Sequence, residues 1–249
     1  MAYGLLNAAE PHFHAHLHRL LDGGAKRVCD VGGGARPIVP LELARQHGLA
    51  YVVFDADPEQ LHKAAGYRVA AGSALDRGDV DALVDQHGPF DAVLSRWTAE
   101  HMSSGRSFHE NVFRMLRPGG TALHIFPTLY ALPFLANRLL SESHSRALLG
   151  LALPSRKHKW AAYYSWCRGP SERQLRRLED VGYAIDRYIG FYGHNLYTRA
   201  PPLHRAEQAF AKLLARHPQA ALTSFAVVVL RRPDTTRPTR SAALTTIVA

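Results

Sequence analysis

The sequence predicts one α/β domain with a doubly wound sheet, in which most strands are parallel and helices cover both faces. Three observations lead to this prediction. Short apolar runs alternate with helical segments about five times along the chain. The runs at 27–31 and 51–54 are compact and apolar, as in strands buried on both faces. The 249 residues suffice for one large domain and are few for two.

Helices and strands are expected to take turns along the first half of the chain. Apolar residues at helical spacing predict a helix from Leu5 to Leu21. Asp57 is expected to cap a helix that has Pro58 in its first turn and Gln60 at the capping-box position. The other helices are expected at 38–46, 79–87 and 107–115, and the strands at 27–31, 51–54, 90–94 and 121–126.

The second half of the chain differs in composition. Residues 127–170 are rich in aromatic residues, prolines and basic residues, and we expect them to form a substrate-covering insertion. A single domain is expected over 1–231, with an N-terminal helix within 1–24 and a disordered tail at 232–249. The later elements are expected to be helices at 171–181 and 203–216 and strands at 184–189 and 225–231.

Composition narrows the class of protein. The net charge of +9 comes mostly from arginines spread along the chain, so we assign it to solubility and do not expect nucleic acid as a partner. No apolar run reaches the roughly 18 residues that cross a bilayer, and no membrane contact is expected. Because Cys29 falls in a buried strand and Cys167 is the only other cysteine, we expect no disulfide framework and a cytoplasmic location.

A glycine run follows the first predicted strand. Residues 32–34 are all glycine and come just after Asp30, so the backbone can turn sharply there and a ligand can approach it. Asp55 ends the second strand, where a carboxylate can accept hydrogen bonds from both hydroxyls of a ribose. Together these features predict a nucleotide site; the alternative is a tight turn with a surface aspartate.

The glycine run departs from the dinucleotide pattern at one position. That pattern is G-x-G-x-x-G, and its third glycine lets helix and strand pack around a pyrophosphate. Pro37 occupies the third position here. S-adenosylmethionine carries no phosphate, so a site for this cofactor does not need that helix end.

These motifs resemble those of class I S-adenosylmethionine-dependent methyltransferases of the type 11-like group. The resemblance covers residues 25–126 and is weaker beyond them. Its most specific stretch is Leu116-Arg117-Pro118-Gly119-Gly120, which is similar to the family's turn before strand five. The other similar stretches are Val28-Cys29-Asp30-Val31-Gly32-Gly33-Gly34, Val52-Val53-Phe54-Asp55-Ala56-Asp57, Phe90-Asp91-Ala92-Val93-Leu94-Ser95 and Glu100-His101.

The resemblance implies a Rossmann-like seven-stranded sheet with an antiparallel C-terminal strand, and methyl transfer from S-adenosylmethionine. In such a site the glycines face the methionine part of the cofactor, and Asp30 helps to hold the loop and the cofactor amino group. Asp55 binds the ribose and Ala56 flanks the adenine. Ser73 stands where the family often has an aspartate that reads the adenine, and a serine can still accept a hydrogen bond. The implied cofactor residues are Asp30, Gly32, Gly33, Gly34, Asp55, Ala56, Ser73, Ala74, Ser95 and Arg96.

The acceptor side of the site is less defined, although Ser95 and Arg96 are expected beside the sulfonium. Methyl transfer needs an aligned acceptor and, for some acceptors, a base that removes a proton. His101 is the leading candidate for this base, because imidazole titrates near neutral pH. The alternative is that His101 only packs or hydrogen-bonds at a helix start.

Residues 157–168 place aromatic side chains beside cations. Tyr163, Tyr164, Trp166 and Arg168 are therefore expected to contact a flat or anionic substrate, with a packing surface as the alternative. The histidines at 12, 14, 16 and 18 include pairs four residues apart, but they have no third ligand in the sequence pattern. We expect no metal.

The function that these features predict is methylation of a small molecule, with oxygen or nitrogen acceptors favoured. Methylation of RNA or another macromolecule stays open, although the fourth strand ends in Ser95-Arg96-Trp97-Thr98 and not in the Asn/Asp-Pro-Pro-Tyr run of enzymes that methylate base amino groups. An NAD-dependent oxidoreductase is disfavoured by Pro37. A methyltransferase fold that uses the cofactor for cyclisation, or binds it without methyl transfer, is the last alternative. The oligomeric state is not predicted.

Overall fold

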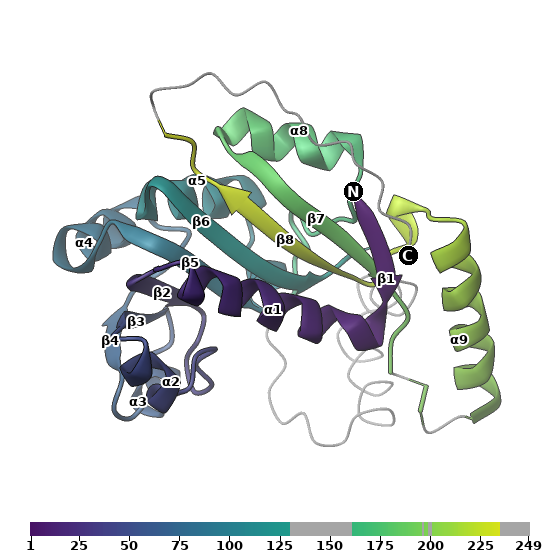
Figure 1. Ribbon diagram of the computed structural model, residues 1–249, viewed down its shortest axis with the longest axis horizontal. Coiled ribbons are helices and arrows are strands. Elements are labelled where there is room, and N and C mark those ends of the chain that lie inside the picture. Colours follow the sequence, from purple (N-terminus) through teal and green to yellow (C-terminus); the bar gives the residue numbers. More distant parts are fainter. Residues whose placement is uncertain (130–160, 196, 199–200, 235–249) are drawn as a thin grey trace.

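The computed structural model describes residues 1–129, 161–195, 197–198 and 201–234, whose strands form an eight-stranded sheet (Figure 1). The strand order is β1-β7-β8-β6-β5-β2-β3-β4. The strands are β1 (Ala2–Leu5), β2 (Arg27–Val31), β3 (Ala50–Asp55), β4 (Arg68–Ala71), β5 (Phe90–Arg96), β6 (Leu116–Pro127), β7 (Ala184–Tyr192) and β8 (Phe225–Arg231).

Most of the strands are parallel, as predicted. β2 pairs in parallel with both β3 and β5, while β3 pairs with β4 and β5 with β6 in the same sense. β8 runs antiparallel to β6 and β7, so the antiparallel C-terminal strand is confirmed. The chain moves outward from β2 to β4 and then returns to β5 on the other side of β2. Ligands of open α/β sheets bind at such a switch point, beyond the carboxyl ends of the strands.

The sheet has one strand more than the seven predicted. Ala2–Leu5 forms β1, which lies parallel to the end of β7, with Tyr3 opposite Gly190. The helix predicted from Leu5 therefore starts later, as α1 (Ala9–Asp22), after a 3₁₀ turn at Leu6–Ala8. Helical spacing alone does not reveal β1, because the strand forms on a hydrogen-bonding edge supplied by residues far along the sequence.

Helices cover both faces of the sheet, which confirms the doubly wound prediction. Apolar side chains of α1, α2 and α3 pack on one face, and those of α4, α5 and α8 pack on the other. Helix α9 lies against the β1 and β7 edge, where Ala211 and Leu214 contact Tyr192 (Figure 1). These helices are α2 (Leu41–Gln46), α3 (Pro58–His62), α4 (Arg77–His87), α5 (Gly105–Met115), α8 (Glu172–Val181) and α9 (Pro201–Arg216).

The segment after the glycine run is less helical than predicted. Helix α2 starts at Leu41 instead of residue 38. The backbone amides at 38 and 39 do not enter a helix, because they donate hydrogen bonds to the side chains of Asp30 and Tyr51. A connection of turns and bends thus ties the glycine loop to the sheet.

Two predictions concern residues that lie mostly outside the described ranges. Of the expected insertion at 127–170, residues 130–160 are not described, and of the expected tail at 232–249, residues 235–249 are not described. Within the described ranges, no helix is both long enough and apolar enough to span a membrane. Cys29 and Cys167 are both buried and form no disulfide.

Candidate active site

A cavity of about 1010 Å³ opens at the carboxyl ends of β2, β3 and β5, the place that the strand order marks for a ligand. Four segments line it: the glycine loop after β2, the end of β3 with the start of α3, the turn after β4, and the end of β5 with the 3₁₀ turn Ala99–His101. Nine of the ten predicted cofactor residues line this cavity, namely Asp30, Gly32, Gly33, Gly34, Asp55, Ala56, Ser73, Ala74 and Arg96.

The glycine loop needs glycine at two positions for different reasons. Gly32 has φ +74°, and a side chain there would collide with Thr98. Gly34 has φ +36°, and a Cβ would lie 2.9 Å from Asp55 Oδ2. The loop therefore approaches both neighbouring strand ends so closely that any side chain would block the cavity or push the strands apart.

Asp30 is buried at the end of β2 and holds this loop in place. Its Oδ2 accepts hydrogen bonds from the Tyr51 hydroxyl at 2.6 Å and from the Ile38 amide at 2.7 Å. Its Oδ1 is buried and has no hydrogen-bond partner among the described residues. Burial raises the pKa of Asp30 to about 6, although the bonds from Tyr51 and Ile38 and the charge of Arg96 act in the opposite direction.

Asp55 ends β3 on the same rim. Its Oδ1 accepts a hydrogen bond from the Asp57 amide at 2.9 Å, and burial raises the pKa of the Asp55 carboxyl above its ordinary value. Asp57 in turn caps α3, as predicted, by accepting from the Glu59 amide at 2.8 Å. Asp55 lines the cavity, where a carboxylate can accept hydrogen bonds from a pair of hydroxyl groups.

The last two residues of β5, Ser95 and Arg96, have their side chains on opposite faces of the sheet. Arg96 lines the cavity, whereas Ser95 is fully buried on the other face and hydrogen-bonds to His124 Nδ1 at 2.8 Å. The expectation that Ser95 lies beside the cofactor is not met by this placement, because successive side chains of a strand point to opposite faces. Ser95 instead belongs to the packing beneath the cavity.

Residues just after β5 also line the cavity, and the sequence did not single them out. Trp97 has φ +57°, an uncommon conformation for a non-glycine residue, and its ring packs edge-on against Phe225 at 5.4 Å. Thr98 fills the space above Gly32, and Met102 continues the wall. Their position immediately after a motif-bearing strand is the one sequence signal that could have identified them.

His101 lies on the cavity wall at the end of its 3₁₀ turn. Its Nδ1 lies 2.8 Å from the carbonyl oxygen of Ala161, which can only accept, so Nδ1 carries a proton and donates it. Its Nε2 lies 3.9 Å from Oε1 of the buried Glu100. These contacts fix the orientation of the imidazole from both sides.

Residues 161–168, the described part of the predicted aromatic stretch, lie next to the cavity but do not line it within the described parts of the chain. Tyr163 is half exposed, Tyr164 is buried, and Trp166 stacks on His109 at 6.0 Å. The amides of Tyr163 and Tyr164 donate to the Glu100 carbonyl, which seats the segment beside His101. The predicted substrate contacts of these residues stay a prediction.

Arg168 is held by the same segment. Its Nη1 donates to the carbonyl oxygens of Tyr164 at 2.6 Å and Cys167 at 3.0 Å. Residues 157–160 of the predicted aromatic stretch lie outside the described ranges. No group of three or more histidine, cysteine or acidic side chains that could hold a metal occurs in the described part of the chain.

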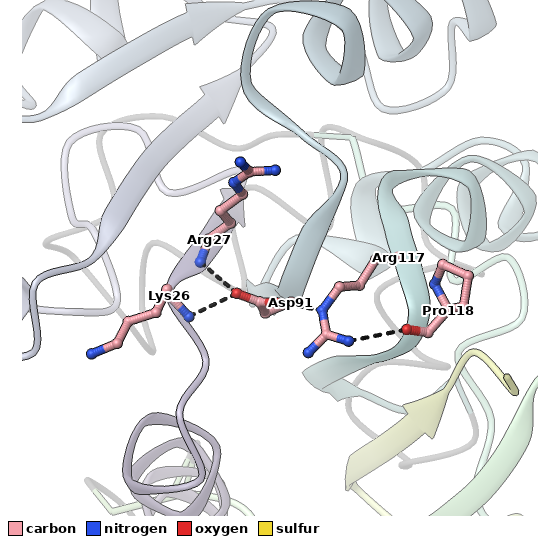
Figure 2. A network of polar contacts seen from close by, with 5 residues as sticks. All are labelled: Lys26, Arg27, Asp91, Arg117 and Pro118. Carbon is pink, nitrogen blue, oxygen red and sulfur yellow. Dashed lines mark hydrogen bonds and ion pairs between the residues drawn. The ribbon is translucent and has the colours of Figure 1, made fainter.

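Two of the motif-like stretches meet at the opposite end of the sheet from the cavity (Figure 2). Asp91, at the start of β5, accepts hydrogen bonds from the amides of Lys26 at 2.8 Å and Arg27 at 2.7 Å. It also accepts from Arg117 Nε, while Arg117 Nη1 donates to the Pro118 carbonyl at 3.2 Å. These residues join the starts of β2, β5 and β6 and do not take part in the cavity.

The cavity residues fit S-adenosylmethionine. Asp55 presents a carboxylate for ribose hydroxyls, and the side-chain-free loop at 32–34 leaves room for a ligand close to the backbone. Asp30 contributes a buried negative charge with one unpartnered oxygen among the described residues, which suits a ligand amino group. The turn at 72–74 also lines the cavity, and the resemblance places the adenine of the cofactor beside it.

Relatives among known proteins agree with this assignment. Two uncharacterized methyltransferases, from Mycobacterium sp. (strain JLS) and Mycolicibacterium gilvum (strain PYR-GCK), are 32% identical over 111 residues and 34% identical over 107 residues. These matches cover 45% and 43% of this chain, but only 42% and 41% of those relatives.

Solved structures share the fold at low sequence identity. A SAM-dependent methyltransferase from Archaeoglobus fulgidus has a TM-score of 0.52 and 17% identity, with 90% of this chain and 94% of that chain covered. The [4+2]-cyclase SpnF has a TM-score of 0.53 and 16% identity, with 92% and 82% covered.

The family assignment rests on a longer match. The profile of the methyltransferase domain family matches residues 9–187, which is well over half of the chain and includes both strand ends that carry Asp30 and Asp55. The protein therefore belongs to the methyltransferase domain family.

Proposed function

We propose that this protein transfers a methyl group from S-adenosylmethionine to an oxygen or nitrogen atom of a small molecule, with His101 as the base. The fixed orientation of His101 at the cavity carries the proposal. Because Nδ1 donates to the Ala161 carbonyl at 2.8 Å, a neutral imidazole keeps its lone pair on Nε2. A hydroxyl or ammonium acceptor has to lose a proton during methyl transfer, and such a lone pair can accept it.

The remaining cavity residues would hold and orient the two reactants. S-adenosylmethionine supplies an activated methyl group when it is bound. Asp55 would hold its ribose and the glycine loop its amino-acid end, so that the methyl group lies toward the end of β5. Trp97 and Met102 would exclude water from the acceptor beside His101.

The charges of the cavity wall support a small acceptor. Three carboxylates and three cations line the cavity within the described residues, so neither sign dominates. A surface that follows a nucleic-acid backbone is strongly basic, because it has to neutralise phosphates. The lining side chains are Asp30, Asp55, Asp57, Arg36, Lys63 and Arg96.

The size and class of the acceptor can be tested with a labelled methyl group. The enzyme is incubated with radiolabelled S-adenosylmethionine and with bacterial extract split into small-molecule, protein and nucleic-acid fractions. We expect label to enter the small-molecule fraction, with release of an equal amount of S-adenosylhomocysteine. Label in nuclease-sensitive material would contradict the proposal, as would turnover of an acceptor without S-adenosylhomocysteine release.

The role of His101 is tested by His101→Gln, which keeps a hydrogen-bonding side chain but cannot take up a proton. We expect kcat to fall at least a hundredfold, with the acidic limb of the pH–rate profile lost and cofactor affinity unchanged. His18→Gln is the matched control, since His18 is exposed on α1, away from the cavity. An unchanged kcat in His101→Gln would place the base elsewhere or show that the acceptor needs none.

A further inference from the structure

Helix α9 runs along the outer edge of the sheet beside β1, and its residues divide into three faces (Figure 1). One face is docked on the fold, where Ala211 and Leu214 are buried against Tyr192. Because successive residues of a helix are turned by about 100°, the solvent side of α9 separates into an apolar face and a basic face.

The apolar face carries Leu203, Phe210 and Leu213. These side chains lie seven and three residues apart, which aligns them along the helix, and together they are called the apolar stripe. They are 49%, 44% and 53% exposed. Seven large hydrophobic side chains are exposed within the described residues, and three of them belong to this stripe. Single exposed leucines are ordinary, but apolar side chains gathered on one helix face indicate a contact surface.

The third face of α9 carries Arg205, Lys212 and Arg216, called the basic row. All three side chains are exposed, and none makes an ion pair within the described parts of the chain. The exposed residues of α9 include no acid, since Glu207 is half-buried and accepts a hydrogen bond from the His194 amide at 3.0 Å. The basic row therefore keeps its positive charge beside the apolar stripe.

The two exposed faces together limit what can cover α9. A nucleic acid would neutralise the basic row, but its phosphate backbone gains nothing from an apolar stripe. A second copy of this chain would match the stripe, but a two-fold contact joins the same patch of both copies and would bring cations to cations. The occupant has to be apolar and anionic at once.

The surface of an anionic membrane has this chemistry. A helix with Phe and Leu on one face and Lys and Arg on another lies in the plane of the interface, with its apolar side chains at the headgroup–acyl boundary. We propose that α9 binds an anionic lipid surface, with the apolar stripe inserted at this boundary and the basic row at the lipid phosphates. A flat surface can contact both faces along the roughly 24 Å length of the helix.

This contact differs from a membrane span. No helix in the described ranges can cross a bilayer, and the expectation of no membrane contact rested on the lack of a spanning run. An interfacial helix needs no such run. No residue of α9 lines the cavity at the ends of β2, β3 and β5, so the inference goes beyond the proposed reaction and does not depend on the acceptor.

The test is sedimentation of the whole protein with vesicles of phosphatidylcholine, prepared with and without phosphatidylglycerol. We expect at least tenfold tighter binding to the vesicles that contain phosphatidylglycerol, and a loss of this binding as salt is added. Equal binding to both kinds of vesicle would overturn the proposal. So would the absence of binding to either, which would leave a protein with an acidic and apolar surface as the occupant.

The apolar stripe is tested by the double variant Phe210→Ser and Leu213→Ser. Binding to anionic vesicles should weaken at least tenfold, while S-adenosylhomocysteine binding, which reports on folding, stays at the wild-type level. Val69→Ser is the matched control, because Val69 is 43% exposed on β4 and belongs to no such stripe. Unchanged vesicle binding in the double variant would show a purely electrostatic contact and overturn the proposal.

The basic row is tested by Arg205→Gln combined with Arg216→Gln. This double variant should also bind anionic vesicles at least tenfold more weakly, because it removes two charges that would lie at the phosphates. Arg114→Gln combined with Arg173→Gln is the control, since it removes the same charge from exposed positions on α5 and α8. Equal weakening in both double variants would assign vesicle binding to net charge and not to α9, and would overturn the proposal.

Discussion

Asp30 and Asp91 are carboxylates on neighbouring strands at opposite ends of the sheet, and their surroundings differ. Asp91 lies at the start of β5, where two backbone amides and Arg117 donate to it (Figure 2). Asp30 lies at the end of β2, with one oxygen bonded twice and the other without a hydrogen-bond partner in the described chain. Both carboxylate oxygens of Asp91 accept hydrogen bonds from the protein, whereas Asp30 keeps one oxygen that a ligand can use.

The pKa shifts of the two carboxyls follow from this difference. Burial acts to raise the pKa of Asp91, but the hydrogen bonds from Arg27, Arg117 and Lys26 outweigh it and leave the pKa below its ordinary value. Burial dominates at Asp30 and raises its pKa to about 6. Asp91, which joins the strands, therefore stays ionised at neutral pH. Asp30, which faces the cavity, has a pKa close to neutral pH.

Two buried histidines extend the comparison beneath the cavity end. His124 pairs with Ser95 across β5 and β6, and its ring lies 5.5 Å from that of His109. Nδ1 of His109 and Nε2 of His124 have no hydrogen-bond partner among the described residues. Burial lowers the pKa of His109 to about 3, and it lowers the pKa of His124 well below its ordinary value, with a further contribution from His109.

The largest effect that we predict is loss of stability in acid. Both histidines bind protons in the unfolded chain below about pH 6.5 and stay neutral in the folded protein. The stability that they contribute is thus complete above pH 6.5 and is lost as the pH falls, by up to about 1.4 kcal/mol per pH unit for each histidine. Urea unfolding between pH 7.5 and 4.5 should show a smaller slope of free energy against pH in His109→Gln. An identical slope in wild type and variant would show that this site does not set the acid sensitivity.

The next effect tests the ligand end of the sheet. Asp55→Ala should remove two charge-assisted hydrogen bonds to the ribose, each worth about 1.5–3 kcal/mol. Cofactor affinity should fall by about 3 kcal/mol, or roughly a hundredfold, while the free energy of unfolding without cofactor changes little. Calorimetry and urea unfolding of the same preparation measure both quantities. Unchanged affinity would mean that the ribose is held elsewhere.

Asp91→Ala is the reverse experiment at the other end. It removes three hydrogen bonds that join β2, β5 and β6, so the free energy of unfolding should fall by about 2 kcal/mol, since water replaces part of the loss at the partly exposed amides. The affinity for S-adenosylhomocysteine should stay within twofold of wild type. A tenfold loss of affinity without loss of stability would show that Asp91 supports ligand binding and not the joining of the strands.

Strand prediction from the sequence succeeded where a local pattern was enough. The apolar runs at 27–31, 51–54 and 225–231 became β2, β3 and β8, because strands buried on both faces leave this pattern in the sequence. The strand Arg68–Ala71 was missed, because it is an exposed edge without that pattern. β1 was missed for a different reason, since its pairing partner is β7, at the other end of the chain.

The candidate site shows the same division. Asp30, Asp55 and the glycines line one cavity, and the sequence singled them out because a loop that meets a ligand through its backbone needs these residue types in sequence order. Their contacts with the cofactor stay a prediction. Ser95 does not line the cavity as expected. The strand continues to Arg96, whose side chain lines the cavity, and Ser95 therefore faces the opposite side of the sheet. Trp97 and Thr98 were not singled out, because a kinked backbone after a strand has no sequence signature of its own.

The smallest predicted effect concerns Tyr51, whose hydroxyl donates to Asp30 at 2.6 Å and accepts from the Val39 amide at 3.2 Å. Tyr51→Phe should weaken S-adenosylmethionine binding at neutral pH by about 1 kcal/mol, or roughly fivefold. Without this donor the pKa of Asp30 should rise further, so cofactor affinity should decline at a higher pH than in wild type as the carboxylate is protonated. Calorimetric titrations from pH 5.5 to 8 measure both changes. Tyr67→Phe is the control, because the Tyr67 hydroxyl donates to the Val39 carbonyl at 3.0 Å and not to Asp30; the same pH shift in both variants would mean that loop packing, and not the charge of Asp30, sets the affinity.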